Sequence, residues 1–240
     1  MQAFDSRAIG PFGILHLVFF GLWIPLAAFR SKRKLEDPLA YPARKVHFAS
    51  TLILQLAFGG ISIAIAQREW IDLFAPYSPT ALHIGLGALA LASMIAFMAP
   101  RWRRNVERRL KKIDLFSPRD GLERTLWIAV SIAAGIGEEL TYRGVMFTLL
   151  LRWTGVPDLA VLIAAVVFSI SHLVQGWRAA LVIFAFAIVF HVLVMSTGTL
   201  FVAMGVHVLY DITAGMVYGT LCRRRDARDA RDAASVPHTG

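Results

Sequence analysis

The sequence predicts an all-α, polytopic membrane protein with about seven transmembrane helices. Hydrophobic residues make up 57% of the 240 residues and charged residues only 17%, whereas a soluble globular domain carries about 25% charged residues. The apolar residues gather in runs of bilayer length, and most basic residues lie between these runs. Because positive charge marks the cytoplasmic side, we expect an integral membrane protein with its N-terminus outside and its C-terminus in the cytoplasm, in the plasma membrane if the source is bacterial.

Three predicted spans occupy the first half of the chain. They cover residues 12–29, 46–66 and 80–99, and a basic segment directly follows the first of them. The loop at residues 101–124 is the most basic and carries apolar residues at helical spacing. We interpret it as an amphipathic surface helix on anionic lipid headgroups; a solvated linker is the alternative.

Four predicted spans follow, and the first of them is unusually long. Residues 122–153 would reach about 45 Å as one helix, which predicts either a tilted helix or a break near Gly135, Gly137 or Gly144. The other three spans cover residues 159–173, 179–195 and 200–221. The tail after them repeats Arg-Asp-Ala and is predicted to be disordered.

The predicted organisation has three parts. Residues 1–121 hold the N-terminal helices and the basic loop, residues 122–222 form the core, and residues 223–240 form the tail. The net charge of +9 lies in loops rather than along a groove, so we expect lipid headgroups and not nucleic acid as the partner. The single cysteine, Cys222, excludes an internal disulfide framework.

Ionisable residues inside the spans mark the candidate site. Glu138, Glu139 and Arg143 lie within one apolar run, although each charge near the bilayer centre costs roughly 2.5–3.5 kcal/mol. Glu139 and Arg143 have the i,i+4 spacing of a helical ion pair, and adjacent helical residues diverge by about 100°. Arg143 is therefore expected to neutralise Glu139 and to leave Glu138 facing a cavity.

The later spans add two further i,i+4 pairs, Phe168 with His172 and His207 with Asp211. We expect Phe168 to form a wall beside His172. A buried carboxylate among imidazoles is suited to activate water as a general base, to hold a metal or to stabilise an oxyanion. A polar network that joins helices and a proton or ion pathway remain alternatives. The first-half residues His16, His47, His83 and Gln55 are scattered, and we interpret most of them as interfacial or singly bonded.

These three motifs resemble the CPBP family of intramembrane proteases, which contains the CAAX prenyl endopeptidases of the Rce1 type and the bacterial Abi proteins. The EExxxR motif of the family matches Glu138, Glu139 and Arg143; FxxxH matches Phe168 and His172; HxxxN or HxxxD matches His207 and Asp211. The resemblance covers about residues 122–221. Asp211 stands where Asn is commoner in the family, and His191 lies where the family has small or apolar residues, so we leave His191 out of the site.

The resemblance implies an endopeptidase with its catalytic residues on the last four helices. Glu138 and His172 would activate water, His207 and Asp211 would position it or stabilise the oxyanion, and Glu139 and Arg143 would support the site. If the family chemistry is metal-dependent, His172 and His207 would hold a divalent ion such as zinc, although the sequence has no HExxH motif. The substrate would be a terminal segment of a membrane-associated protein or peptide, with prenylated CAAX tails as one option. A non-catalytic membrane scaffold or immunity protein and an ion or proton transporter remain alternative functions.

Overall fold

A computed structural model describes residues 8–34, 42–74 and 80–235, and all regular elements within these ranges are helical. The all-α prediction is therefore confirmed. The elements are α1 (Pro11–Val18), η1 (Phe19–Trp23), α2 (Ile24–Lys34), α3 (Arg44–Arg68), α4 (Ala81–Glu107), α5 (Lys111–Leu115), α6 (Gly121–Glu138), η3 (Glu139–Met146), α7 (Phe147–Thr154), α8 (Pro157–Ser171), η4 (Leu173–Gln175), α9 (Trp177–Thr197) and α10 (Leu200–Ala234).

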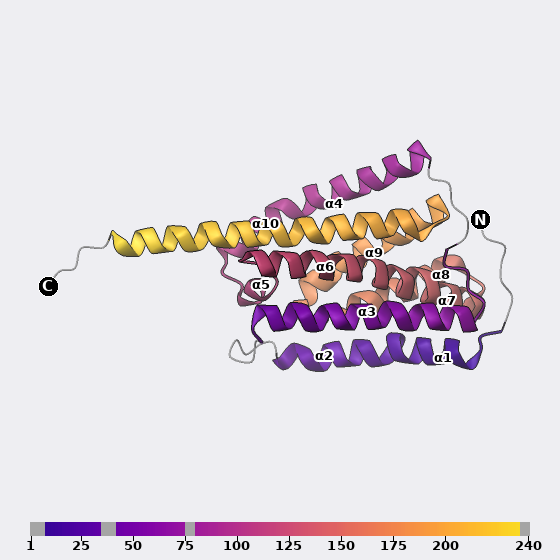
Figure 1. Ribbon diagram of the computed structural model, residues 1–240. Helices are drawn as coiled ribbons and strands as arrows, with labels where there is room; N and C mark the ends of the chain where they lie inside the picture. Colours follow the sequence, from indigo (N-terminus) through magenta and orange to yellow (C-terminus); the bar gives the residue numbers. More distant parts are fainter. Residues whose placement is uncertain (1–7, 35–41, 75–79, 236–240) are drawn as a thin grey trace.

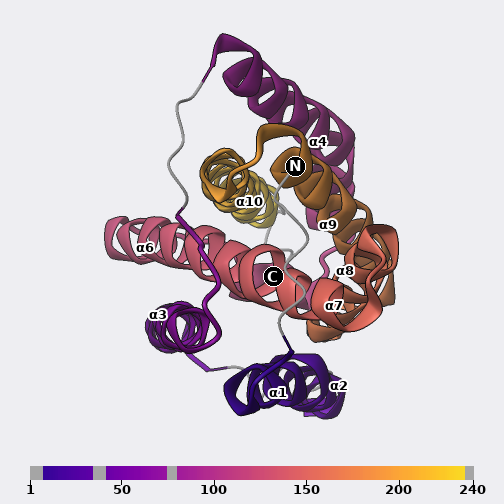
Figure 2. The ribbon, with the colours of Figure 1, turned by 90° about the vertical axis from the view of Figure 1, so that its right-hand side faces the viewer.

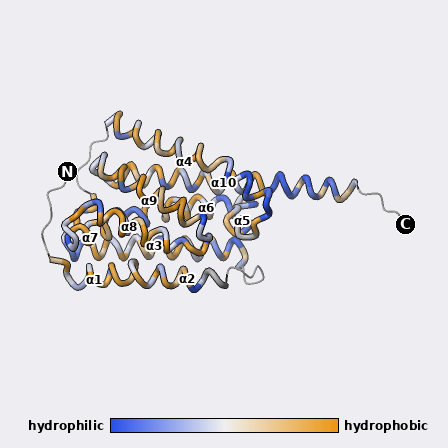
Figure 3. The backbone as a smooth tube through the Cα atoms, turned by 180° about the vertical axis from the view of Figure 1, so that it is seen from behind, coloured by the Kyte–Doolittle hydropathy of each residue, from blue (hydrophilic) through white to orange (hydrophobic). Residues whose placement is uncertain are grey.

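The long helices lie side by side in one bundle, with the short helix α5 at one end (Figure 1). Seen end-on, α6 runs obliquely across the bundle between α3 and α10, and it packs against both (Figure 2). The backbone is predominantly apolar along the bundle, whereas the end that carries α5 and the projecting part of α10 are hydrophilic (Figure 3). This distribution is that of a membrane-embedded bundle with one strongly polar end.

Among the described residues, five helical segments are long and apolar enough to cross a membrane: Pro11–Ser31, Arg44–Arg68, Ala81–Glu107, Trp177–Thr197 and Leu200–Ala234. The chain is thus an integral, polytopic membrane protein, although the predicted number of seven spans is not confirmed. The two other predicted spans are interrupted or short. The first is the α6–η3–α7 segment, which changes helix type within the bundle, and the second is α8, with 15 residues.

A π-helical segment, η3, replaces the break that the glycines of this region suggested. It begins at Glu139, continues the axis of α6 without a loop, and has every residue buried. π-Helical turns are rare and occur frequently at functional sites, because the wider turn changes the direction of the side chains that follow. The segment ends in α7, whose last turn closes at Gly155 in the left-handed conformation.

Two glycines let neighbouring helices approach the start of this segment. A Cβ atom at Gly135 would lie 2.8 Å from the backbone nitrogen of Val208 on α10. A Cβ atom at Gly137 would lie 2.9 Å from the carbonyl oxygen of Gln55 on α3. Only glycine permits such close backbone contact. Glu138 and Glu139 consequently lie where α3 and α10 both come close to α6.

The predicted surface helix at residues 101–124 is not formed. Helix α4 instead continues to Glu107, and the apolar side chains of Trp102 and Val106 are buried within the protein. The Trp102 ring lies 6.1 Å from the ring of Tyr210 and 6.2 Å from that of Tyr218, both on α10. The regularly spaced apolar residues that suggested a lipid-facing helix therefore include residues that cover α10.

The prediction of a disordered tail is wrong for residues 223–234, which continue α10 as helix. Residues 236–240 lie outside the described part of the chain. Arginine and alanine are good helix formers, and the repeats meet opposite charges near α5. Arg109 pairs with Asp229 at 2.8 Å, Arg225 with Asp114 at 3.3 Å, and Arg119 with both Asp114 and Asp226. Charges that composition alone assigns to solvent are thus used in tertiary ion pairs.

Candidate active site

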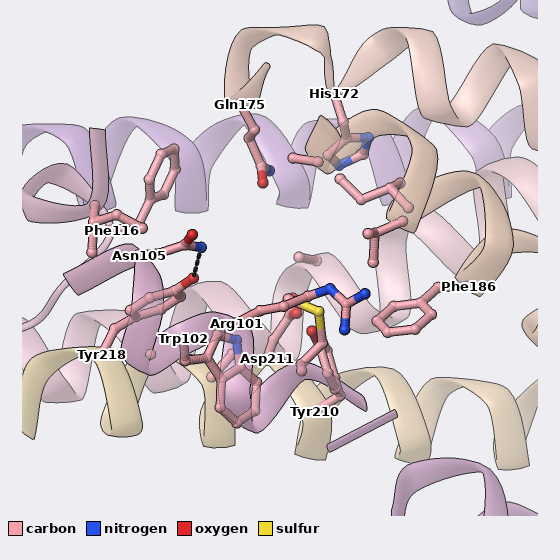
Figure 4. Close-up of a pocket in the computed structure, with 18 of the residues that line it drawn as sticks. Arg101, Trp102, Asn105, Phe116, His172, Gln175, Phe186, Tyr210, Asp211 and Tyr218 are labelled. Atoms are coloured by element: carbon pink, nitrogen blue, oxygen red, sulfur yellow. Dashed lines mark hydrogen bonds between the residues drawn. The ribbon is translucent and has the colours of Figure 1, made fainter. Parts of the chain in front are cut away.

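A cavity of about 1020 Å³ lies within the bundle and is lined mainly by α3, α4, α6, α8, α9 and α10. Its lining includes the end of α4, the connection between α8 and α9 and part of α5, so the cavity extends to the α5 end of the bundle. Figure 4 looks into it, with His172 and Gln175 on one wall and Tyr210 and Asp211 on the other. All four residues predicted to be catalytic, Glu138, His172, His207 and Asp211, line this one cavity.

Glu138 stands between the two imidazoles. Its Oε1 lies 3.9 Å from Nε2 of His172, and its Oε2 lies 3.8 Å from Nε2 of His207. Both distances exceed those of a direct hydrogen bond. The Glu138 side chain is 11% exposed, so the carboxylate reaches the cavity while most of its surface is covered. A small molecule such as water, bound on the cavity side, can contact the carboxylate and an imidazole together.

The tautomer of His172 follows from its backbone contact. Its Nδ1 lies 2.8 Å from the carbonyl oxygen of Phe168, one turn earlier on α8. A carbonyl only accepts hydrogen bonds, so Nδ1 carries the proton. In the neutral ring, Nε2 then presents a lone pair toward Glu138. The Phe168 ring lies 4.5 Å from the imidazole and forms the wall that the sequence predicted.

His207 is oriented in the same way by a carboxylate. Its Nδ1 donates to Oε1 of Glu139 at 2.8 Å, which directs Nε2 toward Glu138 and toward Asp211, whose Oδ2 lies 3.7 Å away. The ring of Phe190 stacks on the imidazole with a centroid distance of 4.9 Å. Sequence reasoning missed this role of Phe190, which belongs to none of the motifs.

Arg143 and Glu139 form the buried pair that their spacing predicted. Nη1 of Arg143 lies 3.3 Å from Oε1 of Glu139, and neither side chain is exposed. The guanidinium also lies over the rings of Phe168 and Phe190, at 4.4 and 5.2 Å, where cation–π attraction adds to the ion pair. Arg143 thus compensates the Glu139 charge and leaves Glu138 to the cavity.

Asp211 contributes through both its side chain and its backbone. Its carboxylate is 30% exposed and lines the cavity beside His207. Its carbonyl oxygen accepts a hydrogen bond of 2.9 Å from the indole of Trp127 on α6. This contact ties the segment of α10 that carries His207 and Asp211 to α6, the helix that carries Glu138.

Gln55 belongs to the site although sequence reasoning treated it as a scattered polar residue. Its Nε2 donates to Oε1 of Glu138 at 2.7 Å, from α3. His16, on the first helix, is buried next to Ser62 of α3, which in turn contacts Thr141 of η3 at 2.8 Å. Nothing in the local sequence pattern links these residues, since they lie 46 to 83 positions from their partners.

The residues suggested as metal ligands do not form a closed ligand set. In the described part of the chain, no three or more His, Cys, Asp or Glu side chains are grouped so as to hold a metal ion. Nε2 of His172 and Nε2 of His207 each face Glu138, at 3.9 and 3.8 Å. His191 is buried on α9 against Phe147 and is not among the residues that line the cavity.

Part of the chain matches the model of a known protein family. Residues 121–213 match the family model described as type II CAAX prenyl endopeptidase Rce1-like. The matched segment contains Glu138, Glu139, Arg143, Phe168, His172, His207 and Asp211, and the predicted resemblance is confirmed for it. No curated protein and no solved structure matches the chain significantly. The family match supports a protease role for this membrane protein.

Proposed function

We propose that this protein is an intramembrane endopeptidase that hydrolyses a peptide bond near the terminus of a membrane-associated protein or peptide. One observation carries the proposal. The Glu138 carboxylate lies between two imidazole Nε2 atoms, at 3.9 and 3.8 Å, on the wall of a cavity of about 1020 Å³. A carboxylate held in this way is suited to take a proton from a bound water.

In the proposed reaction, Glu138 and His172 bind and activate the water. Glu138 accepts one water proton as the water oxygen attacks the carbonyl carbon of the peptide bond. When the tetrahedral intermediate collapses, the C–N bond breaks and the departing nitrogen receives that proton from Glu138. Atoms and charges then balance, and the carboxylate is regenerated for the next cycle.

His207 and Asp211 act on the other side of the reacting carbonyl. A protonated His207 can donate from Nε2 to the developing oxyanion, and the Glu139 carboxylate on Nδ1, 2.8 Å away, compensates the charge of that imidazolium. Asp211, 3.7 Å from the same Nε2, restricts where water or the oxyanion can lie. Arg143 supports the site by compensating Glu139.

The charge of the cavity lining indicates how substrate enters. Four arginines, Arg101, Arg104, Arg108 and Arg178, line the cavity, and positive charge of this kind marks the cytoplasmic side. We therefore propose that the site opens to the cytoplasm, with the N-terminus outside. Aromatic walls that include Phe116, Trp177 and Phe186 suit an apolar terminal segment, and a prenylated CAAX tail is one such segment.

The test compares peptide termini in membranes from cells that express the wild type, Glu138→Gln or Glu107→Gln at matched abundance. Glu107 is an exposed carboxylate at the end of α4, outside the main cavity, and serves as the control. New termini that vanish only in Glu138→Gln support proteolysis and identify the substrate. Identical profiles, with all three proteins folded, would contradict it and favour a membrane scaffold or immunity protein. Ion flux lost in Glu138→Gln without proteolysis would identify a transporter.

A further inference from the structure

We propose that Gln55 is a positioning residue of this site, which holds the Glu138 carboxylate so that one oxygen faces each imidazole. The inference rests on the proposed function of Glu138 as the base. It adds a residue from α3 (Arg44–Arg68), which lies outside the family-matched segment of residues 121–213. The site is then completed by the N-terminal part of the chain.

The contact itself is short and directional. Nε2 of Gln55 donates to Oε1 of Glu138 at 2.7 Å, and Oε1 is the oxygen that faces His172, whereas Oε2 faces His207. The terminal torsion of a glutamate is soft and lets the carboxylate turn. Within the described residues, Gln55 is the only hydrogen-bond donor to this carboxylate. Without it, nothing in the described site keeps the plane of the carboxylate aligned with both rings.

Backbone packing places the amide at this point. A Cβ atom at Gly137 would lie 2.9 Å from the carbonyl oxygen of Gln55 itself, and a Cβ atom at Gly59 would lie 3.3 Å from Cα of Gly137. Further along α3, Ser62 contacts Thr141 at 2.8 Å. These contacts fix the position of α3 against α6 and η3, and the Gln55 side chain needs little freedom to reach Glu138.

An amide suits this position chemically. Lysine or arginine would neutralise the carboxylate with a full charge, whereas an amide donates a hydrogen bond without adding charge or competing for the proton. The Gln55 amide and the Glu138 carboxylate can therefore keep their roles while Glu138 takes a proton and returns it. Gln55 therefore acts through Glu138 and is expected to affect the chemical step rather than substrate binding.

The experiment measures kcat and KM with a synthetic peptide that spans the cleavage site found by terminal profiling. We expect Gln55→Met, which keeps length but removes the donor, to lower kcat about 10–100-fold with KM nearly unchanged, as is usual for groups that orient a reacting side chain. Gln55→Glu keeps the shape but replaces the donor with an acceptor, and its kcat should fall further. Gln55→Asn, whose shorter amide can regain the bond only if α3 shifts, should recover part of the rate.

A second pair of variants tests the same geometry through the backbone. Gly137→Ala must push α3 away from Glu138, whereas a Cβ atom at Gly60, on the same helix, would contact nothing within 4 Å. Gly137→Ala should lower kcat, and Gly60→Ala should leave kcat unchanged. The two substitutions add the same methyl group, so a general effect of alanine in the bundle would lower both.

The outcomes separate this inference from the proposed function. An inactive Glu138→Gln together with an unchanged kcat for Gln55→Met would overturn the role of Gln55 and leave the protease intact. A raised KM at constant kcat would also overturn it, because Gln55 would then contact substrate. If Gln55→Met does not fold, the isosteric Gln55→Glu is tested in its place. Full activity of Gln55→Glu would overturn the inference. An active Glu138→Gln would remove the proposed function itself.

Discussion

Glu139 accepts a hydrogen bond from Nδ1 of His207 at 2.8 Å, through the same oxygen that lies 3.3 Å from Nη1 of Arg143. One buried carboxylate therefore orients an imidazole and compensates a guanidinium at once. The two adjacent glutamates thus have a division of roles: Glu138 faces the cavity, and Glu139 faces the protein interior. The division depends on the angle of about 100° between neighbouring helical side chains.

The first prediction concerns this orienting contact. Glu139→Gln keeps the shape of the side chain but removes the charge beside His207 and Arg143. We expect kcat to fall about 10–100-fold at equal amounts of folded protein, as for other groups that orient a catalytic imidazole. The measurement compares cleavage rates of purified protein with Glu107→Gln as the control. Equal rates would mean that His207 needs no anionic partner.

The second prediction concerns the stability of the buried ion pair. Arg143→Ala removes the permanent cation beside the buried Glu139 and leaves only its hydrogen bond with His207; breaking a buried ion pair costs roughly 3–5 kcal/mol. His207→Ala removes a hydrogen-bond partner of Glu139 but leaves its ion pair with Arg143 in place. We therefore expect Arg143→Ala to lower protein abundance in membranes more than His207→Ala does.

Abundance is measured in matched membrane preparations. Arg103→Ala, at an exposed arginine of α4, controls for the loss of a cationic side chain as such. Equal abundance of the Arg143 and His207 variants would contradict the pairing as the main source of stability at this point.

The site was predictable from sequence as far as helical spacing reaches. The pairs Glu139–Arg143 and His207–Asp211 are four residues apart, and they lie at 3.3 and 3.7 Å. Gln55 was not predictable, because its partner lies 83 residues away on another helix and no period connects them. The orientation of His207 by Glu139 spans 68 residues and was likewise beyond local reasoning.

The fold was likewise predictable only where local sequence patterns determine it. Apolar runs predicted the helices, but the continuation of α10 to Ala234 depends on Asp114, Arg119 and Arg109, which lie far away in sequence. Composition alone indicated disorder at residues 223–234, because it gives the number of charged residues but not their ion-pair partners. The π-helical segment that begins at Glu139 is buried along its whole length, and the glycines of this region suggested only that some irregularity was present.

The third prediction concerns metal dependence. The mechanism proposed above uses the Glu138 carboxylate as the base, and His172 and His207 do not form a closed ligand set with it. We expect proteolysis by purified protein to survive incubation with EDTA and with a zinc-selective chelator. Inactivation that zinc reverses, but magnesium does not, would instead assign His172 and His207 as metal ligands.

The last prediction concerns Asp211, the last residue of the HxxxD motif that begins at His207. Its Oδ2 lies 3.7 Å from Nε2 of His207, so this imidazole has carboxylates on several sides. If Asp211 serves to position water or the oxyanion, an amide of the same shape can replace it and can donate a hydrogen bond as well. We expect Asp211→Asn to retain kcat within about tenfold and Asp211→Leu to lower it about 10–100-fold, the usual cost of losing a group that orients a reacting residue. Both rates are measured at matched amounts of folded protein. Either variant keeps the contact with Trp127, because that contact uses the backbone carbonyl of residue 211. An asparagine variant as inactive as the leucine variant would show that the negative charge of Asp211 is required, and His207 would then act chiefly as an imidazolium held between carboxylates.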